Sequence, residues 1–107
     1  MKTYVIDLDH TLCDTPKNED GSWNYIGATP LGERIEKVNK LKESGNTIII
    51  ETARGSASGR DWFSVTENQL NEWGLKYDKL RVGTKFAADY FIDDKGINSE
   101  DFFNGIN

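Results

Sequence analysis

The sequence predicts an α/β domain built on a mainly parallel sheet, because three short apolar runs alternate with amphipathic stretches. The runs cover residues 3–8, 47–50 and 90–92, and they are rich in β-branched and aromatic side chains. They are too short for helices and are typical of buried strands. Acidic or hydroxyl side chains end each run, which predicts a site at the carboxyl edge of the sheet. We therefore expect a Rossmann-like, three-layer arrangement of strands and helices.

Two helices are expected in the amphipathic stretches. In the first stretch, apolar residues recur at spacings of three or four and form one buried stripe. These residues are Leu31, Ile35, Val38 and Leu41. Thr29 is the expected N-cap, Pro30 the first helical residue and Gly45 the end of this helix. The second helix is expected over residues 62–73, with Gly74 ending it.

Weaker signals complete the expected fold. A further strand is predicted over residues 79–82, and a short docked helix over residues 98–107, where Asn98 begins a cap-like sequence. Residues 12–28 are rich in Gly, Pro, Asn and Asp, which are typical of turns. We interpret this segment, called the flap below, as a cover beside the edge of the sheet.

Composition limits the kinds of partner. The chain has 107 residues, 36 % of them hydrophobic, which fits one packed domain over residues 1–107 with no room for a cap domain. A net charge of −5 disfavours binding to long nucleic acid, which needs a basic face. Cys13 is the single cysteine, so neither an internal disulfide nor a cysteine-based zinc cluster is expected. Without a signal-peptide pattern or an apolar run near the roughly 20 residues of a membrane helix, we expect a cytoplasmic protein with no membrane partner.

The strongest chemical feature is the sequence Asp7-Leu8-Asp9-His10-Thr11 at the end of the first predicted strand. Two carboxylates this close repel each other unless a cation or a shared proton relieves them. Mg²⁺ is suited to this, because it takes oxygen ligands from one or two carboxylates and keeps other positions for water and phosphate. The alternative is a strand end with solvated acids, in which Thr11 only caps the next segment.

The other strand ends carry complementary groups. Thr52 follows the second predicted strand, Asp93 and Asp94 follow the third, and Lys85 precedes the third. Phosphoryl transfer needs a metal ion and a lysine to neutralise the transferring oxygens, a hydroxyl to orient them and a carboxylate to attack. Convergence of these residues at one edge therefore predicts phosphoryl-transfer chemistry.

These motifs, DLDHT, ETAR, TK and IDD in this order, resemble those of the haloacid dehalogenase-like (HAD) phosphohydrolases over about residues 3–96. The resemblance implies that Asp7 forms an aspartyl-phosphate and that Asp9 acts as general acid and then base. It implies that Thr52 and Lys85 hold the phosphoryl oxygens. The chain looks most like small capless members associated with bacterial capsule and surface-sugar synthesis.

The same resemblance implies a Mg²⁺ cofactor. Its ligands would be Asp7, the backbone carbonyl of Asp9 and either Asp93 or Asp94, with the other acid acting through water. The family usually has Gly where His10 stands, so His10 is either a substrate contact or a bystander at the turn, and we favour the bystander.

Candidate substrate contacts are Thr11 beside the acids, Trp23 and Tyr25 in the flap, and Arg54 after the second strand. The two aromatic side chains either stack on a sugar or base, or only pack the flap down. Arg54 either binds an anion or lies in a solvated loop. Because no cap can seal the site, water must be excluded by the flap, by the substrate or by a second subunit in a homo-oligomer.

The sequence therefore predicts a Mg²⁺-dependent phosphomonoester hydrolase acting on a phosphorylated sugar or other small metabolite. One alternative is a nucleotide or polynucleotide phosphatase, given a looser likeness to the phosphatase half of polynucleotide kinase-phosphatases. Another is a non-catalytic phospho-receiver module. In receiver domains the phosphoacceptor aspartate stands alone after the third strand, whereas here the acids bracket Thr52 and Lys85, which favours the enzyme.

Overall fold

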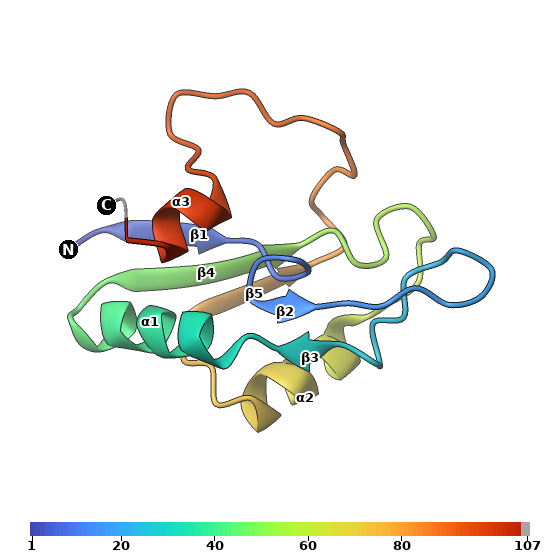
Figure 1. Ribbon diagram of the computed structural model, residues 1–107, viewed down its shortest axis with the longest axis horizontal. Coiled ribbons are helices and arrows are strands. Elements are labelled where there is room, and N and C mark those ends of the chain that lie inside the picture. Colours follow the sequence, from blue (N-terminus) through green and yellow to red (C-terminus); the bar gives the residue numbers. More distant parts are fainter. Residues whose placement is uncertain (106–107) are drawn as a thin grey trace.

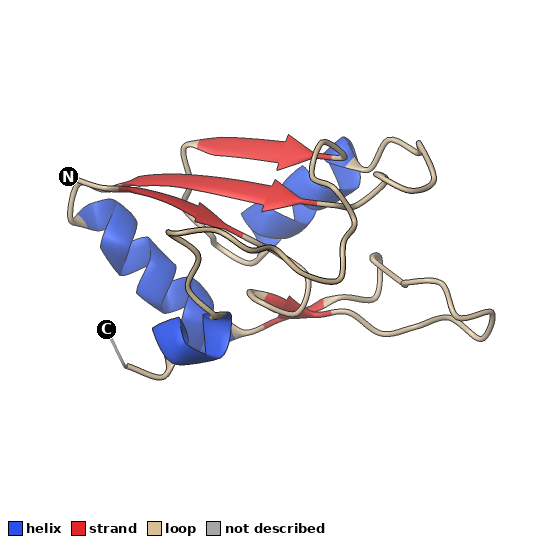
Figure 2. Ribbon diagram, turned by 90° about the horizontal axis from the view of Figure 1, so that it is seen from above, coloured by secondary structure: helices blue, strands red, loops and turns tan. Residues whose placement is uncertain are grey.

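Three parallel strands form the centre of the fold in the computed structural model, which describes residues 1–105 (Figure 1). They are β1 (Thr3–Ile6), β4 (Thr47–Thr52) and β5 (Lys79–Val82), in the spatial order β1-β4-β5. Tyr4 pairs with Ile48 in the first ladder, and β4 and β5 are also parallel. All three carboxyl ends therefore lie at one edge of the sheet, as Figure 2 shows.

The core lies between one face of this sheet and two helices, α1 (Gly32–Glu43) and α2 (Phe63–Glu72). Residues of β4 alternate in exposure, so that Ile48 and Ile50 point into the core. The buried core side chains are Ile6, Leu8, Leu12, Cys13, Ile35, Val38, Ile48, Ile50, Leu70 and Leu75. The other face is less covered: Val5 there is 61 % exposed.

A short helix, α3 (Ser99–Phe103), packs against α1 and β1. The ring of Phe102 lies 6.0 Å from that of Tyr4, and Lys37 of α1 donates a hydrogen bond to the carbonyl oxygen of Phe102. The side chain of Asn98 accepts the N–H of Glu100, which confirms the predicted cap. Residues 106–107 of the predicted tail helix lie outside the described residues.

A small antiparallel pair joins the two ends of the flap: β2 (Cys13–Asp14) lies at its start, and β3 (Thr29–Pro30) directly follows it. The prediction that Thr29 and Pro30 begin the first helix is therefore wrong. The N–H of Leu31 donates to the carbonyl oxygen of Leu12, which extends the strand-like contact. As a result, α1 begins only after Leu31, without a side-chain cap.

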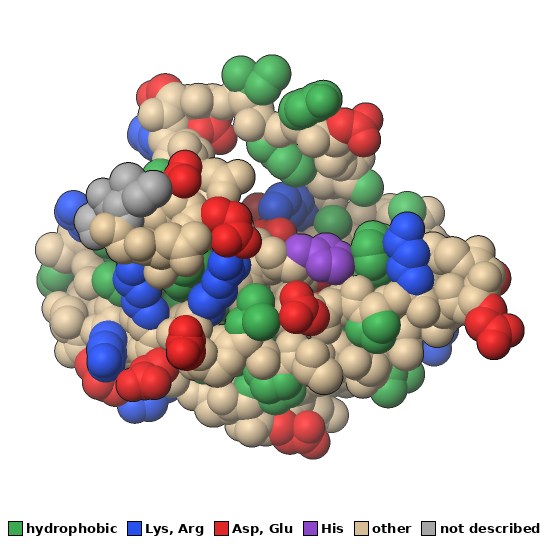
Figure 3. Space-filling view, viewed as in Figure 1, with side chains coloured by type: hydrophobic (Ala, Val, Ile, Leu, Met, Phe, Trp, Pro, Cys, Tyr) green, Lys and Arg blue, Asp and Glu red, His purple; other side chains and the backbone are tan. Residues whose placement is uncertain are grey.

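The predicted strand over residues 90–92 is also wrong. This stretch belongs to a loop that runs from β5 to α3 and arches over the sheet, and Ile92 is 94 % exposed. Figure 3 shows hydrophobic side chains standing on this loop. Strand propensity depends on a pairing partner as much as on residue type. Here the carboxylate of Asp93 accepts the N–H groups of Lys95 and Gly96 and stabilises a turn instead.

The predicted fold class is nevertheless confirmed, as a single α/β domain with a parallel sheet flanked by helices. The weaker signal over residues 79–82 corresponds to β5, which supplies the third strand. In residues 1–105, no helix has the length and apolar character needed to cross a membrane.

Candidate active site

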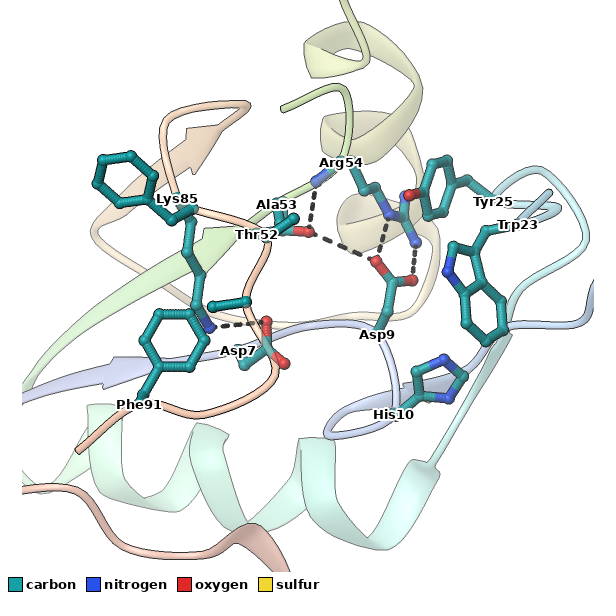
Figure 4. A pocket seen from close by; sticks show the side chains of 13 residues that line it. Asp7, Asp9, His10, Trp23, Tyr25, Thr52, Ala53, Arg54, Lys85 and Phe91 are labelled. Atoms are coloured by element: carbon teal, nitrogen blue, oxygen red, sulfur yellow. Dashed lines mark hydrogen bonds and ion pairs between the residues drawn. The ribbon is translucent and has the colours of Figure 1, made fainter. Parts of the chain in front are cut away.

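A cavity of about 200 Å³ lies at the carboxyl edge of the sheet, between the flap and the loop after β5 (Figure 4). It brings together side chains predicted from four separate stretches of sequence. The four predicted catalytic residues line it: Asp7, Asp9, Thr52 and Lys85. Three predicted substrate contacts also line it: Trp23, Tyr25 and Arg54. The convergence follows from the parallel sheet, because β1 and β4 end side by side.

Asp7 is the accessible carboxylate of the cavity, with a side chain that is 39 % exposed. The ammonium of Lys85 lies 3.4 Å from its Oδ1, and Lys85 itself comes from the loop after β5. The hydroxyl of Thr11 donates to Oδ2 across 3.4 Å. Thr11 lines a neighbouring cavity and not this one. Its hydrogen bond therefore supports a role in orienting Asp7, in place of the predicted contact with substrate.

Asp9 has the opposite environment, because its carboxylate is nearly enclosed by donors. Arg54 donates from Nε to Oδ2 at 3.0 Å and from Nη2 to Oδ1 at 2.9 Å. The hydroxyls of Thr15 and Thr52 donate to Oδ1 and Oδ2. The Thr52 hydroxyl is therefore engaged with Asp9, and it also accepts the N–H of Arg54.

These contacts set the ionisation of Asp9. Burial is the largest single effect and would raise its pKa, but the hydrogen bonds and charge of Arg54, together with hydrogen bonds from Thr15 and Cys13, outweigh burial, so the pKa lies below the ordinary value of 3.8. Proximity to the Asp7 carboxylate would be expected to raise the proton affinity of Asp9, but the pKa is lowered instead. In the free protein at neutral pH, Asp9 is a carboxylate.

Arg54 is 1 % exposed, and the five N–H donors of its guanidinium all have acceptors. Besides Asp9, the acceptors include Thr66 Oγ1 at 3.1 Å and Gln69 Oε1 at 2.6 Å, both from α2. The prediction that Arg54 contacts substrate is therefore wrong, since no donor is left for an anion. Its role is to hold Asp9.

Sequence reasoning did not identify Thr15, Thr66 or Gln69 as part of the site. A usable signal existed in α2, where Thr66 and Gln69 share the buried side of the helix with Leu70. Polar side chains on a buried face need hydrogen-bond partners. Which partner they have depends on the tertiary fold.

Cys13 is buried beside Asp9 and Arg54. Burial, followed by the negative charge of Asp9, raises the pKa of the Cys13 thiol to about 11. The thiol therefore stays neutral and acts as a small buried group that donates weak hydrogen bonds.

His10 and the flap aromatics form one wall of the cavity. His10 has a φ of 64°, in the left-handed region that favours Gly. Its ring lies 4.7 Å from that of Trp23, and the Tyr25 ring lies 4.9 Å from the guanidinium carbon of Arg54. His10 therefore lies in the wall of the cavity and packs against the flap, and its role toward a substrate stays a prediction.

The loop after Arg54 contains a close backbone approach that gives a stability prediction. Gly55 has a φ of 82°, and a Cβ there would lie 2.1 Å from the carbonyl oxygen of Arg60. Gly59 has a similar φ of 74° but open space around it. We expect Gly59→Ala to cost about 1 kcal/mol from left-handed strain and Gly55→Ala about 3 kcal/mol or more, because the loop must also move. Urea unfolding of both variants measures the difference, and equal losses would show that the close approach has no effect.

The predicted magnesium ligands do not come together. Asp93 is engaged with Lys95 and Gly96 in an exposed turn, and Asp94 is exposed. In residues 1–105, no three His, Cys, Asp or Glu side chains are grouped so that they could hold a metal ion. The residues as placed therefore do not form the predicted Mg²⁺ site. Asp7 and Asp93 do line the same neighbouring cavity, which has a volume of about 1170 Å³.

No protein-family model and no curated protein matches the sequence. The fold is similar to a crystal structure of an MCSG target from Vibrio cholerae, with a TM-score of 0.77 and 24 % sequence identity. The similarity covers 96 % of this chain and 88 % of that chain. The two proteins therefore share the same small α/β fold, although their sequences are distant.

Proposed function

We propose that this protein is a phosphomonoester hydrolase of the HAD type that forms an aspartyl-phosphate on Asp7. The observation that supports it is the convergence of Asp7, Asp9, Thr52 and Lys85 on one cavity, although they come from separate parts of the chain. The cavity holds about 200 Å³, which is less than a typical small-molecule site. It suits a phosphoryl group whose carrier extends toward the flap, as in a phosphorylated sugar or other metabolite.

Asp7 is the better nucleophile of the two acids. Its carboxylate is more exposed than that of Asp9, at 39 % against 16 %, and fewer donors engage it. The Lys85 ammonium, 3.4 Å from Asp7, can neutralise the oxygens of a phosphoryl group bound there. A carboxylate is also a good leaving group from phosphorus, so that one difficult hydrolysis becomes two easier steps.

Asp9 is assigned the proton transfers. A bound phosphate brings negative charge beside Asp9, which raises its proton affinity and lets it protonate the departing alcohol oxygen. The Asp9 carboxylate then takes a proton from water, the hydroxide attacks phosphorus and the bond to Asp7 breaks. Arg54 and Thr52 keep the Asp9 oxygens in place through both steps.

Mg²⁺ stays a prediction from the sequence. The described residues do not gather its ligands, so the roles above are limited to side chains of the chain itself. Activity should be measured with Mg²⁺ and with a chelator, so that the need for the ion is determined directly.

Lys85→Gln tests the proposed reaction. We expect this variant to lower kcat/KM for an aryl phosphate by about 100-fold to 1000-fold, because a neutral amide cannot offset the charge of the transferring group. Release of inorganic phosphate is the measurement. Lys79→Gln, on the exposed side of β5, is the matched control and should keep wild-type activity. Equal activity of the two variants would contradict the role of Lys85.

A nucleotide or polynucleotide phosphatase is the second candidate, since Trp23 and Tyr25 line the cavity with rings that could stack on a base. A screen of phosphorylated sugars, nucleotides and 3′-phosphorylated oligonucleotides separates the two substrate classes. Preference for a nucleotide over sugars of similar size would favour the second candidate.

A further inference from the structure

Gln69 connects two parts of the site that are far apart in the sequence. It lies on α2 with its side chain buried. Its Oε1 accepts the Nη1–H of Arg54 at 2.6 Å, and its Nε2 donates to the backbone carbonyl oxygen of Tyr25 at 2.7 Å. The amide orientation is fixed at both ends, because Arg54 can only donate and the carbonyl can only accept.

At one end of this link is the Asp9 ion pair. Arg54 Nη1 has two acceptors, Gln69 and Thr66, and these hold the guanidinium in the plane from which it donates to both Asp9 oxygens. A two-point contact depends on such alignment, because rotation of the guanidinium breaks at least one of its hydrogen bonds. The acceptors on α2 therefore act on Asp9 through Arg54.

At the other end is the flap. The carbonyl oxygen of Tyr25 accepts from Gln69 and from the N–H of Ala28, and the Tyr25 ring packs on Arg54. Gln69 is thus the side chain of α2 that hydrogen-bonds both the flap and Arg54. Thr66, one turn earlier on α2, bonds Arg54 alone among these groups.

We propose that Gln69 is a positioning residue that couples the flap to the Arg54–Asp9 ion pair. Movement of the flap on substrate binding would then shift Gln69 and Arg54, and so change the alignment of Asp9. In the other direction, the Arg54–Asp9 ion pair holds Gln69 in place, and Gln69 holds the flap. The consequence for catalysis rests on the proposed hydrolase function. The mechanical link itself does not.

Hydrogen exchange tests the link without any assay of activity. In Gln69→Leu, which keeps a similar volume but loses both hydrogen bonds, we expect the flap amides of Asn24 and Ala28 to exchange about threefold to tenfold faster. Gln69→Glu keeps an oxygen for Arg54 but cannot donate to Tyr25, so it should also loosen the flap. It serves as the second variant if Gln69→Leu folds poorly. Thr66→Val is the matched control, because it removes an acceptor of Arg54 but no hydrogen bond to the flap, and it should speed flap exchange by less than either Gln69 variant.

Kinetics test the coupling. Gln69→Leu should raise KM for a metabolite-sized phosphate about fivefold more than for a small aryl phosphate, because the larger substrate uses the flap. Thr66→Val removes no hydrogen bond to the flap, so it should change the ratio of the two KM values by less than Gln69→Leu does.

The proposal is overturned if flap exchange is the same in Gln69→Leu and Gln69→Glu as in the wild type, or if Thr66→Val loosens the flap as much. It is also overturned if the KM ratio stays unchanged in Gln69→Leu while flap exchange rises. If no phosphatase activity exists, the exchange result still decides whether the link is present.

Discussion

Asp7→Asn is expected to lower kcat/KM for an aryl phosphate by at least about 1000-fold, which corresponds to about 4 kcal/mol of barrier. An amide oxygen cannot form the acyl-phosphate, and no other carboxylate in the cavity is free to replace it, because Asp9 is held by Arg54, Thr15 and Thr52. The fold should be little affected. The Asp7–Lys85 pair is partly exposed, and such pairs contribute about 1 kcal/mol or less.

Asp14→Asn is the matched control, since Asp14 is an exposed acid on β2 close in sequence to the site. It should keep wild-type activity and stability. Treatment of the working enzyme with borohydride should reduce the acyl-phosphate and label Asp7 alone. Retention of more than about 1 % activity in Asp7→Asn would exclude Asp7 as nucleophile. A stable phosphoryl group on Asp7 without turnover would instead support the receiver-like alternative.

Arg54→Met is expected to have the largest effect on stability, a loss of about 3–5 kcal/mol in urea unfolding at neutral pH. Removing the guanidinium leaves the largely buried Asp9 carboxylate without its counter-charge, and it leaves Thr66 and Gln69 with unmatched oxygens. Arg81→Met is the control, because Arg81 forms an exposed pair with Glu51 at 3.8 Å. That change should cost less than about 1 kcal/mol.

The loss caused by Arg54→Met should depend on pH. In the wild type the pKa of Asp9 is lowered in the fold, so its stabilisation is complete above the ordinary value of 3.8 and is lost as pH falls below that value. In Arg54→Met burial is opposed by the hydrogen bonds of Thr15 and Cys13 but no longer by Arg54, so the pKa of Asp9 is higher than in the wild type and acid costs the variant less stability. The difference between the two proteins should therefore shrink from pH 7 toward pH 3. The double variant Asp9→Asn/Arg54→Met should lose less than the sum of the single changes, and simple additivity would argue against a coupled pair.

The parts of the fold that could be predicted are those that leave a local pattern. Alternation over residues 47–52 and the helical stripe from Leu31 to Leu41 correspond to β4 and α1. Asp7 and Thr52 meet because parallel strands end at one edge, which follows from topology alone. The strand predicted over residues 90–92 is wrong, because three apolar residues carry too little pattern to specify a pairing partner.

The environment of the site could not be predicted, because it depends on contacts across the fold. Arginine is rarely fully buried, and nothing local to Arg54 indicates that α2 supplies acceptors for it. Thr66 and Gln69 lie 12 and 15 residues further along the chain. The lowered pKa of Asp9 depends on this burial and pairing, so the direction of the shift could not be predicted from the sequence either.

The outer side of β1 bears on how the molecule behaves in crowded solution. Among the described residues, no strand pairs with that side of β1, and its backbone groups can serve as a template for a strand of another molecule. Two features limit such self-association: β1 has only four residues, and the charged Lys2 precedes it. Natural proteins use short edge strands and nearby lysines to prevent aggregation at an unpaired sheet edge. The sheet therefore has an unpaired edge at β1, and the short strand and nearby lysine disfavour pairing of this edge with another molecule.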